Sequence, residues 1–414
     1  MNLPVIACVL LLLLDLNVSP VEPSRPQGLA KGRHTPGKGN HHGHSGHSGD
    51  DGHQHDHSDD YNGYSFYVFG DSFADNGNLV KMNPRSELNR QWRYPYGLSG
   101  RFSNSLVQSD LIAYMLGQKK SPPAHRLTRK VGKAGLNFAA GGSGVFDAPD
   151  TQTLARQIHT FHKLVKDGDI DQDRLASKSV ALVAVSGNDY ARLPADTKSF
   201  AEVDDFARKV VEEIAFNVRR LQDIGVEKVL VNNLHPFGCS PSETRAYNHT
   251  RCNERRNLAA TLHNHHLADE LAGMDDVLLL DLNAAFSNVV RHYNDDGDGD
   301  IIPNLFREKL APCCESTDPK GYCGQVDTEK LEPLYKVCDN PNYFFFWDEM
   351  NPTMVGWQAV MGPLDHPIRK FLGLISREYL SYDLLENRRA AGLEMLITVA
   401  CHHRLQIGRR SKEP

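Results

Sequence analysis

Ser65-Phe66-Tyr67-Val68-Phe69 is a short, largely apolar run that leads directly into the tight-turn sequence Gly70-Asp71-Ser72. A run of this length that ends in a turn predicts a buried β-strand. In α/β proteins, reactive groups and ligands gather in the crevice at the carboxyl end of such strands. The turn therefore puts the Ser72 hydroxyl where a nucleophile is expected, although Gly-Asp-Ser is by itself also an ordinary turn sequence.

Further apolar runs of strand length follow along the chain, at 179–185, 228–231, 277–280 and, in an aromatic form, 343–347. Continuous runs of this kind suit strands that are covered on both faces of a sheet. Helical periodicity lies between them, over 203–224, 253–271 and 353–372. The alternation predicts the α/β class: a three-layer α/β/α sandwich with a mainly parallel sheet, formed by one domain over about 61–373.

The helix expected over 203–224 illustrates how the elements are delimited. Its apolar residues fall three or four positions apart and form one stripe. Asp204 and Asp205 are expected in its first turn and two arginines in its last, which suits the helix dipole. Gly225 is expected to end the helix.

The N-terminal 60 residues differ from the rest of the chain. Residues 1–19 contain an apolar run that is too short to span a bilayer, and we interpret them as a secretory signal peptide. Residues 20–60 are rich in Gly, Ser, Asp and His and offer almost nothing apolar to bury, so we interpret them as a disordered linker. Weak binding of zinc or copper by these histidines is the alternative interpretation. At the other end, 374–414 forms an extension to which the sequence assigns no role.

Charge and hydropathy argue against a nucleic-acid partner and against a further membrane-spanning segment. The formal net charge is -6, and no basic face indicates binding to nucleic acid. No stretch beyond the N-terminal segment is long and apolar enough for a transmembrane helix.

Cysteine usage indicates an oxidising compartment. Seven cysteines follow the signal segment, and five of them lie between Cys252 and Cys338 in loop-like sequence, which predicts disulfides in a secreted protein. Cys239 and Cys252 bracket a short polar loop and are the pair that we expect. The odd number leaves at least one thiol free or paired in trans. Asn248-His249-Thr250, inside the same loop, is an acceptor sequence for N-glycosylation.

Four segments at strand ends or in Gly-rich loops carry polar residues suited to catalysis: 69–78, 137–144, 185–189 and 347–353. Acyl transfer needs a nucleophile, a base and donors directed at the developing oxyanion. Ser72 supplies the nucleophile. The backbone N–H groups of Ser72 and Gly142 and the side-chain amide of Asn188 are the candidate donors, and such a donor is typically worth about 3 kcal/mol in the transition state.

In order and spacing, these segments resemble those of the plant GDSL-type esterases/lipases of the SGNH hydrolase superfamily. Tyr94-Pro95-Tyr96-Gly97 and Gly100-Arg101-Phe102-Ser103-Asn104 resemble the sequence that follows the nucleophile in that family. The resemblance covers roughly 61–373. It implies a flavodoxin-like α/β/α sandwich, and the absence of a Gly-x-Ser-x-Gly elbow around Ser72 argues against the α/β-hydrolase fold.

The same resemblance implies a Ser-His-Asp acyl-enzyme cycle that hydrolyses carboxylic esters and needs no metal or cofactor. Ser72 would be the nucleophile, and Asp348 would be the acidic member of the triad. The oxyanion donors would be the N–H groups of Ser72 and Gly142 (Gly141 if the loop registers one residue earlier) and the amide of Asn188.

The chain departs from the family pattern at the histidine of its last segment. Asp348 is present, but Asn351 occupies the place of the histidine three residues later. An amide cannot take a proton near neutral pH, so Ser72 would remain a neutral and poor nucleophile. Three substitutes are open: His366 if the following helix folds back, Asp348 acting through a water, or a loop histidine such as His235, which we otherwise expect at the surface.

The leading hypothesis is a secreted GDSL-type serine esterase/lipase. It would hydrolyse carboxylic esters of lipids, acetylated sugars or other small acyl compounds through an acyl-Ser72 intermediate, with activity weakened by Asn351. The alternative is a catalytically impaired relative that binds acylated ligands or wall polymers in the same cleft. A third hypothesis makes the folded domain the carrier of a His-rich metal-binding segment. The acidic run at 294–300 has partial EF-hand spacing, but Leu305 stands where the last ligand is needed, so we interpret the run as a solvated turn.

Overall fold

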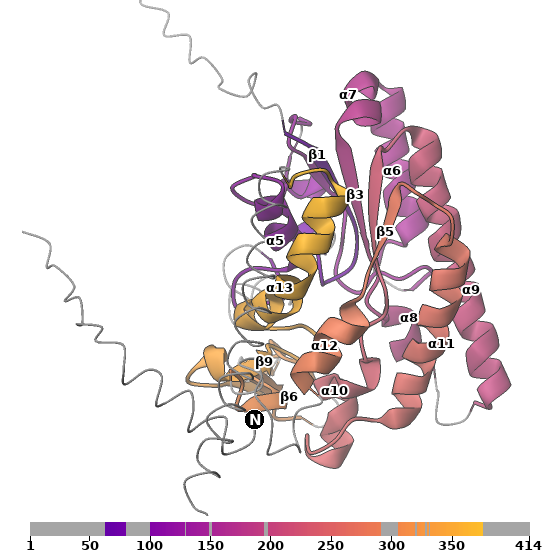
Figure 1. The fold of residues 1–414 in the computed structure, drawn as a ribbon. Helices are drawn as coiled ribbons and strands as arrows, with labels where there is room; N and C mark the ends of the chain where they lie inside the picture. Colours follow the sequence, from indigo (N-terminus) through magenta and orange to yellow (C-terminus); the bar gives the residue numbers. More distant parts are fainter. Residues whose placement is uncertain are drawn as a thin grey trace, which may run out of the picture. The chain divides into compact units, whose positions relative to one another are not determined.

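Five parallel strands form the central sheet of the computed structural model, in the order β2-β1-β3-β4-β5 (Figure 1). Their bounds are Ser65–Gly70 (β1), Gly135–Asn137 (β2), Ser179–Ala184 (β3), Lys228–Asn232 (β4) and Val277–Leu280 (β5). This is the flavodoxin-like order, in which β1 lies between β2 and β3. The predicted strands at 65–69, 179–185, 228–231 and 277–280 are confirmed, whereas the three-residue β2 was not predicted.

The structure describes residues 63–79, 100–128, 130–148, 151–193, 198–290, 305–318, 321–327, 329–330 and 332–375. All of them belong to one compact unit, Asp60–Arg377. The predicted signal peptide, the His-rich linker, the acidic run at 294–300, the 94–97 motif and residues 376–414 lie outside the described residues. Within the described ranges, no helix combines the length and apolar character that a bilayer crossing requires.

Helices cover both faces of the sheet and make it the middle of three layers (Figure 1). Alternate residues of β1 point to opposite faces: Tyr67 and Phe69 enter one buried cluster, and Phe66 and Val68 enter the other. The first face is covered by α6 (Leu154–Lys166), α7 (Gln172–Ser177), α9 (Phe200–Ile224) and α11 (Glu254–Leu271). The second is covered by α5 (Gln108–Met115), α12 (Leu282–Val290) and α13 (Met354–Phe371). The predicted three-layer sandwich is therefore confirmed.

Helix α9 begins three residues earlier than predicted. Ser199 is its N-cap, and Ser199 and Glu202 exchange side-chain-to-backbone hydrogen bonds in a capping box. Asp204 and Asp205 therefore lie beyond the first turn, contrary to the prediction. The Ser-x-x-Glu spacing was the signal that would have corrected the start. At the other end Gly225 adopts a left-handed φ of 109° and ends the helix as expected.

Two small sheets stand beside the sandwich. Strand β6 (Glu308–Pro312) pairs with β9 (Phe344–Phe346), and β7 (Cys314–Ser316) pairs with β8 (Tyr335–Val337). The aromatic run at 343–347 thus forms a strand outside the central sheet, so our expectation of a further strand of that sheet is wrong. Its rings pack against α12 and α13 instead, as in the contact of Phe345 with Phe286.

Three disulfides join the described cysteines: Cys239–Cys252, Cys313–Cys338 and Cys314–Cys323. The pair expected from the sequence, Cys239 with Cys252, is confirmed. The remaining cysteine after the signal segment, Cys401, lies outside the described residues. Short helices complete the connections: α8 (Asn188–Ala191), α10 (Pro241–Thr244) and 3-10 turns at His125–Leu127, Phe237–Cys239, Arg245–Tyr247 and Pro341–Tyr343.

Candidate active site

Ser72 lies in the turn at the carboxyl end of β1, with 8% of its surface exposed. The turn is possible because residue 70 is glycine. Gly70 has a φ of +131°, and a Cβ on it would come within 2.0 Å of the Ala184 carbonyl oxygen of the neighbouring strand. β1 is the strand beside which the chain order reverses, and in such folds this switch point is where ligands bind.

The carboxylate of Asp71, next to Ser72, joins the first and third sequence segments. It accepts hydrogen bonds from the backbone N–H and the hydroxyl of Ser186, at 2.6 and 2.8 Å, and from the side-chain amide of Asn188 at 3.0 Å. It also accepts from the N–H of Phe73. Complete burial raises the pKa of Asp71 to about 7, even though these donors favour the charged form.

A second buried carboxylate, Asp75, organises the glycine loop. It accepts hydrogen bonds from the N–H groups of Gly77, Asn78 and Leu79 in its own turn, and from Gly141 at 2.8 Å. Burial raises the pKa of Asp75 to about 6. Of the two adjacent glycines, Gly141 donates its N–H to Asp75. The N–H of Gly142 does not donate to this carboxylate. Gly142 has a left-handed φ of 75°.

The side chain of Asn188 bridges all three of these segments. Its amide nitrogen donates to Asp71, beside Ser72, and to the Ser143 carbonyl, beside Gly142, at 2.9 Å. Both amide hydrogens are therefore engaged, and an oxyanion would have to share or displace one of these acceptors. The next residue, Asp189, accepts from the N–H groups of Val145 and Phe146 and so anchors the far side of the glycine loop.

Gln157 is a site residue that sequence reasoning missed. It lies fully buried on α6, accepts from the Gly70 N–H at 2.8 Å, and donates to the Gly70 carbonyl and the Ser143 hydroxyl. It thereby ties the end of β1 to the glycine loop. A glutamine on the apolar stripe of a helix, between Leu154 and Phe161, was the available signal, because a buried amide must find polar partners.

Asp348 and Asn351 lie together in the turn between β9 and α13. The amide nitrogen of Asn351 is 3.0 Å from each carboxylate oxygen of Asp348. Asp348 also accepts from the backbone N–H of Met350 and of Asn351. The side-chain oxygen of Asn351 is buried and has no hydrogen-bond partner among the described residues.

Aromatic packing brings this turn to the Ser72 end of the sheet. The ring of Phe73, next to Ser72, meets Trp357 of α13 edge-on with centroids 4.9 Å apart. The N–H of Met354, the first residue of α13, donates to the Asn104 side chain at 2.7 Å. Phe102 and Leu79 lie against Gly141 and also pack against the buried cluster that contains Trp347. All four segments thus meet at one end of the sheet.

Comparison with known proteins identifies the group to which this arrangement belongs. Residues 66–362 match the GDSL-like Lipase/Acylhydrolase family. The chain belongs to this family. GDSL esterase/lipase At5g03610 of Arabidopsis thaliana is 36% identical over 318 residues, which cover 72% of this chain and 85% of that protein. GDSL esterase/lipase At3g09930 of the same plant is 35% identical over 318 residues, covering 72% and 86%.

Solved structures add little to the assignment. LAE5, an alpha/beta hydrolase enzyme from the metagenome of Lake Arreo, Spain, is 13% identical, with a TM-score of 0.27, and covers 60% of this chain and 88% of its own. A similarity this low carries no argument. The GDSL assignment therefore stands on the sequence relatives, and the fold stands on the observed strand order.

The two histidines that could substitute for the triad histidine in this GDSL protein, His235 and His366, lie in different environments. His235 is buried, contrary to the expected surface position, because aromatic side chains from other segments cover it. Its ring contacts Phe73 and Phe286, and its Nε2 lies 3.2 Å from the Ser240 hydroxyl. Burial lowers the pKa of His235 to about 3, which makes it a weak base.

His366 lies on the exposed side of α13, which continues from Met354 to Phe371 without folding back. At 1.5 Å per residue, His366 is about 18 Å along the axis from the start of the helix. It is therefore not available beside Asp348. Within the described ranges, no group of three or more His, Cys, Asp or Glu side chains is arranged to hold a metal ion.

Proposed function

We propose that this protein is a carboxylic ester hydrolase in which Ser72 is the nucleophile. The observation that carries the proposal is the Asn188 amide, which contacts both the neighbour of Ser72 and the neighbour of Gly142. These contacts support a convergence of the Ser72 hydroxyl, the Gly142 N–H and the Asn188 amide, which acyl transfer requires. The domain at 61–373 would carry this activity.

The reaction would follow the acyl-enzyme route. Ser72 Oγ forms a bond to the ester carbonyl carbon, and the oxygen that becomes negative is stabilised by the N–H groups of Ser72 and Gly142 and by the Asn188 amide. The C–O bond to the alcohol then breaks, the proton lost by Ser72 Oγ ends on the alcohol oxygen, and an acyl-Ser72 ester remains. Water attacks this ester, releases the acid and restores the hydroxyl.

Proton transfer is the step that this chain supports poorly. Asn351 donates a hydrogen bond to Asp348 through its amide nitrogen, as the ring N–H of a triad histidine would. Its oxygen can accept a hydrogen bond and orient a hydroxyl, but it cannot remove the proton. Hydrolysis is therefore expected to be slow. In other triad enzymes, loss of the base costs on the order of a million-fold, and binding and oxyanion donors retain roughly a thousand-fold over water.

The same geometry supports a second function, the binding of acylated ligands or wall polymers without turnover. The observation that favours it is the buried oxygen of Asn351, which has no hydrogen-bond partner among the described residues and cannot act as a base. Small-molecule esters or polymer-linked esters would then be ligands rather than substrates.

Four proteins tested on p-nitrophenyl acetate separate the two functions: wild type, Ser72→Ala, Asn351→His, and the double variant. Slow turnover by wild type that Ser72→Ala abolishes supports the hydrolase. Turnover confined to Asn351→His supports the binding function. Turnover that survives Ser72→Ala in both backgrounds contradicts the assignment of the nucleophile.

We further propose that the protein is secreted, with residues 1–19 as signal peptide, 20–60 as linker and 374–414 as an extension. The three disulfides support an oxidising destination. Asn248 is exposed at the end of the 3-10 turn Arg245–Tyr247, where a glycan can be attached. Expression in plant cells tests this: protein in the medium that loses mass on N-glycosidase treatment, and an Asn248→Gln variant that does not, are expected. Retention of the wild type inside the cell is the contrary result.

A further inference from the structure

The residues on either side of Asp348 are held by the two ends of one disulfide. The N–H of Cys314 donates to the Trp347 carbonyl at 2.7 Å, and the N–H of Cys323 donates to the Glu349 carboxylate at 2.7 Å. Cys314 and Cys323 are bonded to each other. A single covalent bond therefore links the two donors that flank the Asp348 turn.

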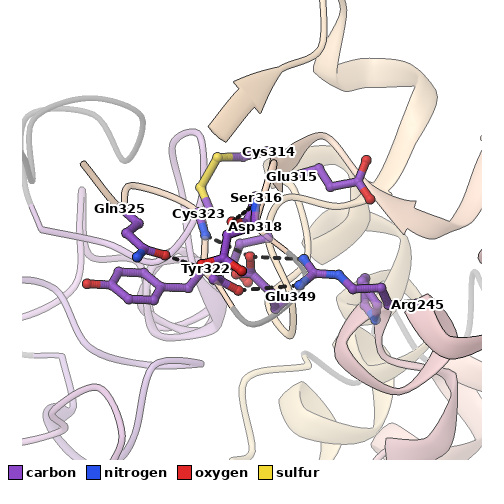
Figure 2. A network of polar contacts seen from close by, with 12 residues as sticks. Arg245, Cys314, Glu315, Ser316, Asp318, Tyr322, Cys323, Gln325 and Glu349 are labelled. Carbon is purple, nitrogen blue, oxygen red and sulfur yellow. Dashed lines mark hydrogen bonds and ion pairs between the residues drawn. A yellow bond between two sulfur atoms is a disulfide. The ribbon is translucent and has the colours of Figure 1, made fainter. Parts of the chain in front are cut away.

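Glu349 is the point where the second of these donors acts. Figure 2 shows its carboxylate between the Cys323 end of the disulfide and the guanidinium of Arg245, whose nearest nitrogen is 3.7 Å away. The Glu349 carbonyl also accepts from the N–H of Ser242, at the start of α10. Glu349 is thus fixed through both its side chain and its backbone, by elements far apart in the sequence.

Holding a carboxylate in this position is costly. The Glu349 side chain is only 17% exposed and follows directly after another buried carboxylate, Asp348. Burial, with repulsion from Asp348, raises the pKa of Glu349 to about 8. Arg245 offsets part of this cost. A residue placed at such a cost is a candidate for function rather than for stability.

We propose that Glu349 is a positioning residue for the Asp348–Asn351 pair and acts through the Cys314–Cys323 disulfide. The proposal rests on the esterase function given above. Without the Glu349 carboxylate, the Cys323 N–H loses its acceptor, and on this side the turn keeps only the bond from the Ser242 N–H to the Glu349 carbonyl. The Asp348 carboxylate then samples a wider range of positions, and a displacement of about 1 Å at a reacting centre can cost on the order of 100-fold in rate.

Three variants test the proposal. Glu349→Ala removes the acceptor. Glu349→Gln keeps an oxygen for the Cys323 N–H and removes the charge. Glu315→Ala is the matched control, because Glu315 follows Cys314 and its carboxylate pairs instead with His249, at 3.3 Å. Hydrogen–deuterium exchange of peptides covering 344–353 reports the position of the turn, and kcat and KM on p-nitrophenyl acetate report its effect, in wild type and in the Asn351→His background.

In Glu349→Ala we expect faster exchange in 344–353 and a kcat lowered about 10- to 100-fold, with KM changed less than about twofold. Glu349→Gln should keep most of the activity, and Glu315→Ala should match its parent in both measurements. Unchanged exchange in Glu349→Ala overturns the proposal whatever the activity. Faster exchange with no hydrolysis by any protein supports the positioning of the turn and contradicts the esterase function.

A second perturbation covers the case in which Glu349→Ala does not fold. The Cys314→Ser, Cys323→Ser double variant removes only the link between the two donors and leaves both N–H groups in place. The same faster exchange over 344–353 is expected. If exchange and kcat both equal those of the parent protein, the disulfide has no part in positioning Asp348.

Discussion

The side-chain nitrogen of Asn351 lies 3.0 Å from both carboxylate oxygens of Asp348, while the oxygen of the same amide is buried without a partner among the described residues. An amide flipped by 180° would set its oxygen against the carboxylate, so electrostatics fixes the observed orientation. This is the direction in which a histidine at position 351 would donate a hydrogen bond to Asp348, and an amide lacks the basicity that a histidine would supply.

Restoring the histidine should restore a pH-dependent esterase. We expect Asn351→His to raise kcat/KM on p-nitrophenyl acetate by at least about 100-fold, the lower end of what general base catalysis contributes. Activity should increase as the imidazole loses its proton, around pH 6.5 for an ordinary histidine. The control is Asp348→Asn in the same background, which should lose most of the gain. Equal rates for Asn351→His and wild type across pH 5 to 8 would show that residue 351 does not face the nucleophile.

Asp189 should support the rate through the glycine loop. Its carboxylate accepts from the N–H groups of Val145 and Phe146 at 3.0 and 3.2 Å, just beyond Gly142. Asp189→Ala frees that side of the loop, and we expect kcat to fall about 10-fold because an oxyanion donor is no longer held in place. Asp147→Ala is the matched control, since Asp147 lies in the same loop with its side chain 73% exposed. Equal kinetics for the two variants would assign Asp189 to stability alone.

The sequence predicted the parts of this fold that follow from local rules. Apolar runs of strand length located β1, β3, β4 and β5, because buried parallel strands need continuous apolar sequence. The rules failed where tertiary contacts decide. Strand β2 is only three residues long, and the aromatic run at 343–347 pairs with β6 instead of entering the central sheet. Neither pairing has a local signal.

At the candidate site, too, local features were predictable from the sequence and long-range contacts were not. The polar segments were evident because Ser72, Gly142, Asn188 and Asp348 follow strands or lie in glycine-rich loops. The long-range partners were not evident: Gln157 comes from α6, and the Cys323 donor comes from a loop beyond β7. His235 was misplaced because its surroundings, the rings of Phe73 and Phe286, are supplied by remote segments.

Burial of His235 should make stability fall with acid. Its folded pKa of about 3 lies below the ordinary value of 6.5, so between these pH values the unfolded chain binds the extra proton and the free energy of unfolding decreases as pH falls. From pH 7.5 to 5.5 this contributes about 1.3 kcal/mol. His263, which is hydrogen-bonded to the Tyr190 hydroxyl, also has a pKa lowered to about 3. It should add a similar loss of unfolding free energy. Urea unfolding at both pH values measures the loss.

His235→Phe should lose about 1.3 kcal/mol less than wild type over the same interval, because phenylalanine does not titrate. The double variant with His263→Phe should show a difference about twice as large, since the two imidazoles hydrogen-bond to different side chains, Ser240 and Tyr190. Both variants lose hydrogen bonds, which lowers their free energy of unfolding at every pH. This constant difference cancels when the change between pH 7.5 and pH 5.5 is compared with that of wild type. A pH dependence identical to wild type in His235→Phe would mean that His235 is hydrated and charged in the folded protein.

The turn that carries Ser72 requires glycine at position 70. It combines a positive φ with a backbone oxygen 2.0 Å from where a Cβ would lie, and that oxygen belongs to β3 and cannot move without parting the sheet. Gly117 has a φ of +77° but nothing within 4 Å, so it isolates the conformational cost alone. We expect Gly117→Ala to lose about 1 kcal/mol of unfolding free energy. Gly70→Ala should lose at least about 3 kcal/mol, because overpacking adds to the same strain. Thermal unfolding of the pair measures the difference. Equal losses would mean that β1 and β3 separate at this point without cost, and the turn that carries Ser72 would then not be fixed by its glycine.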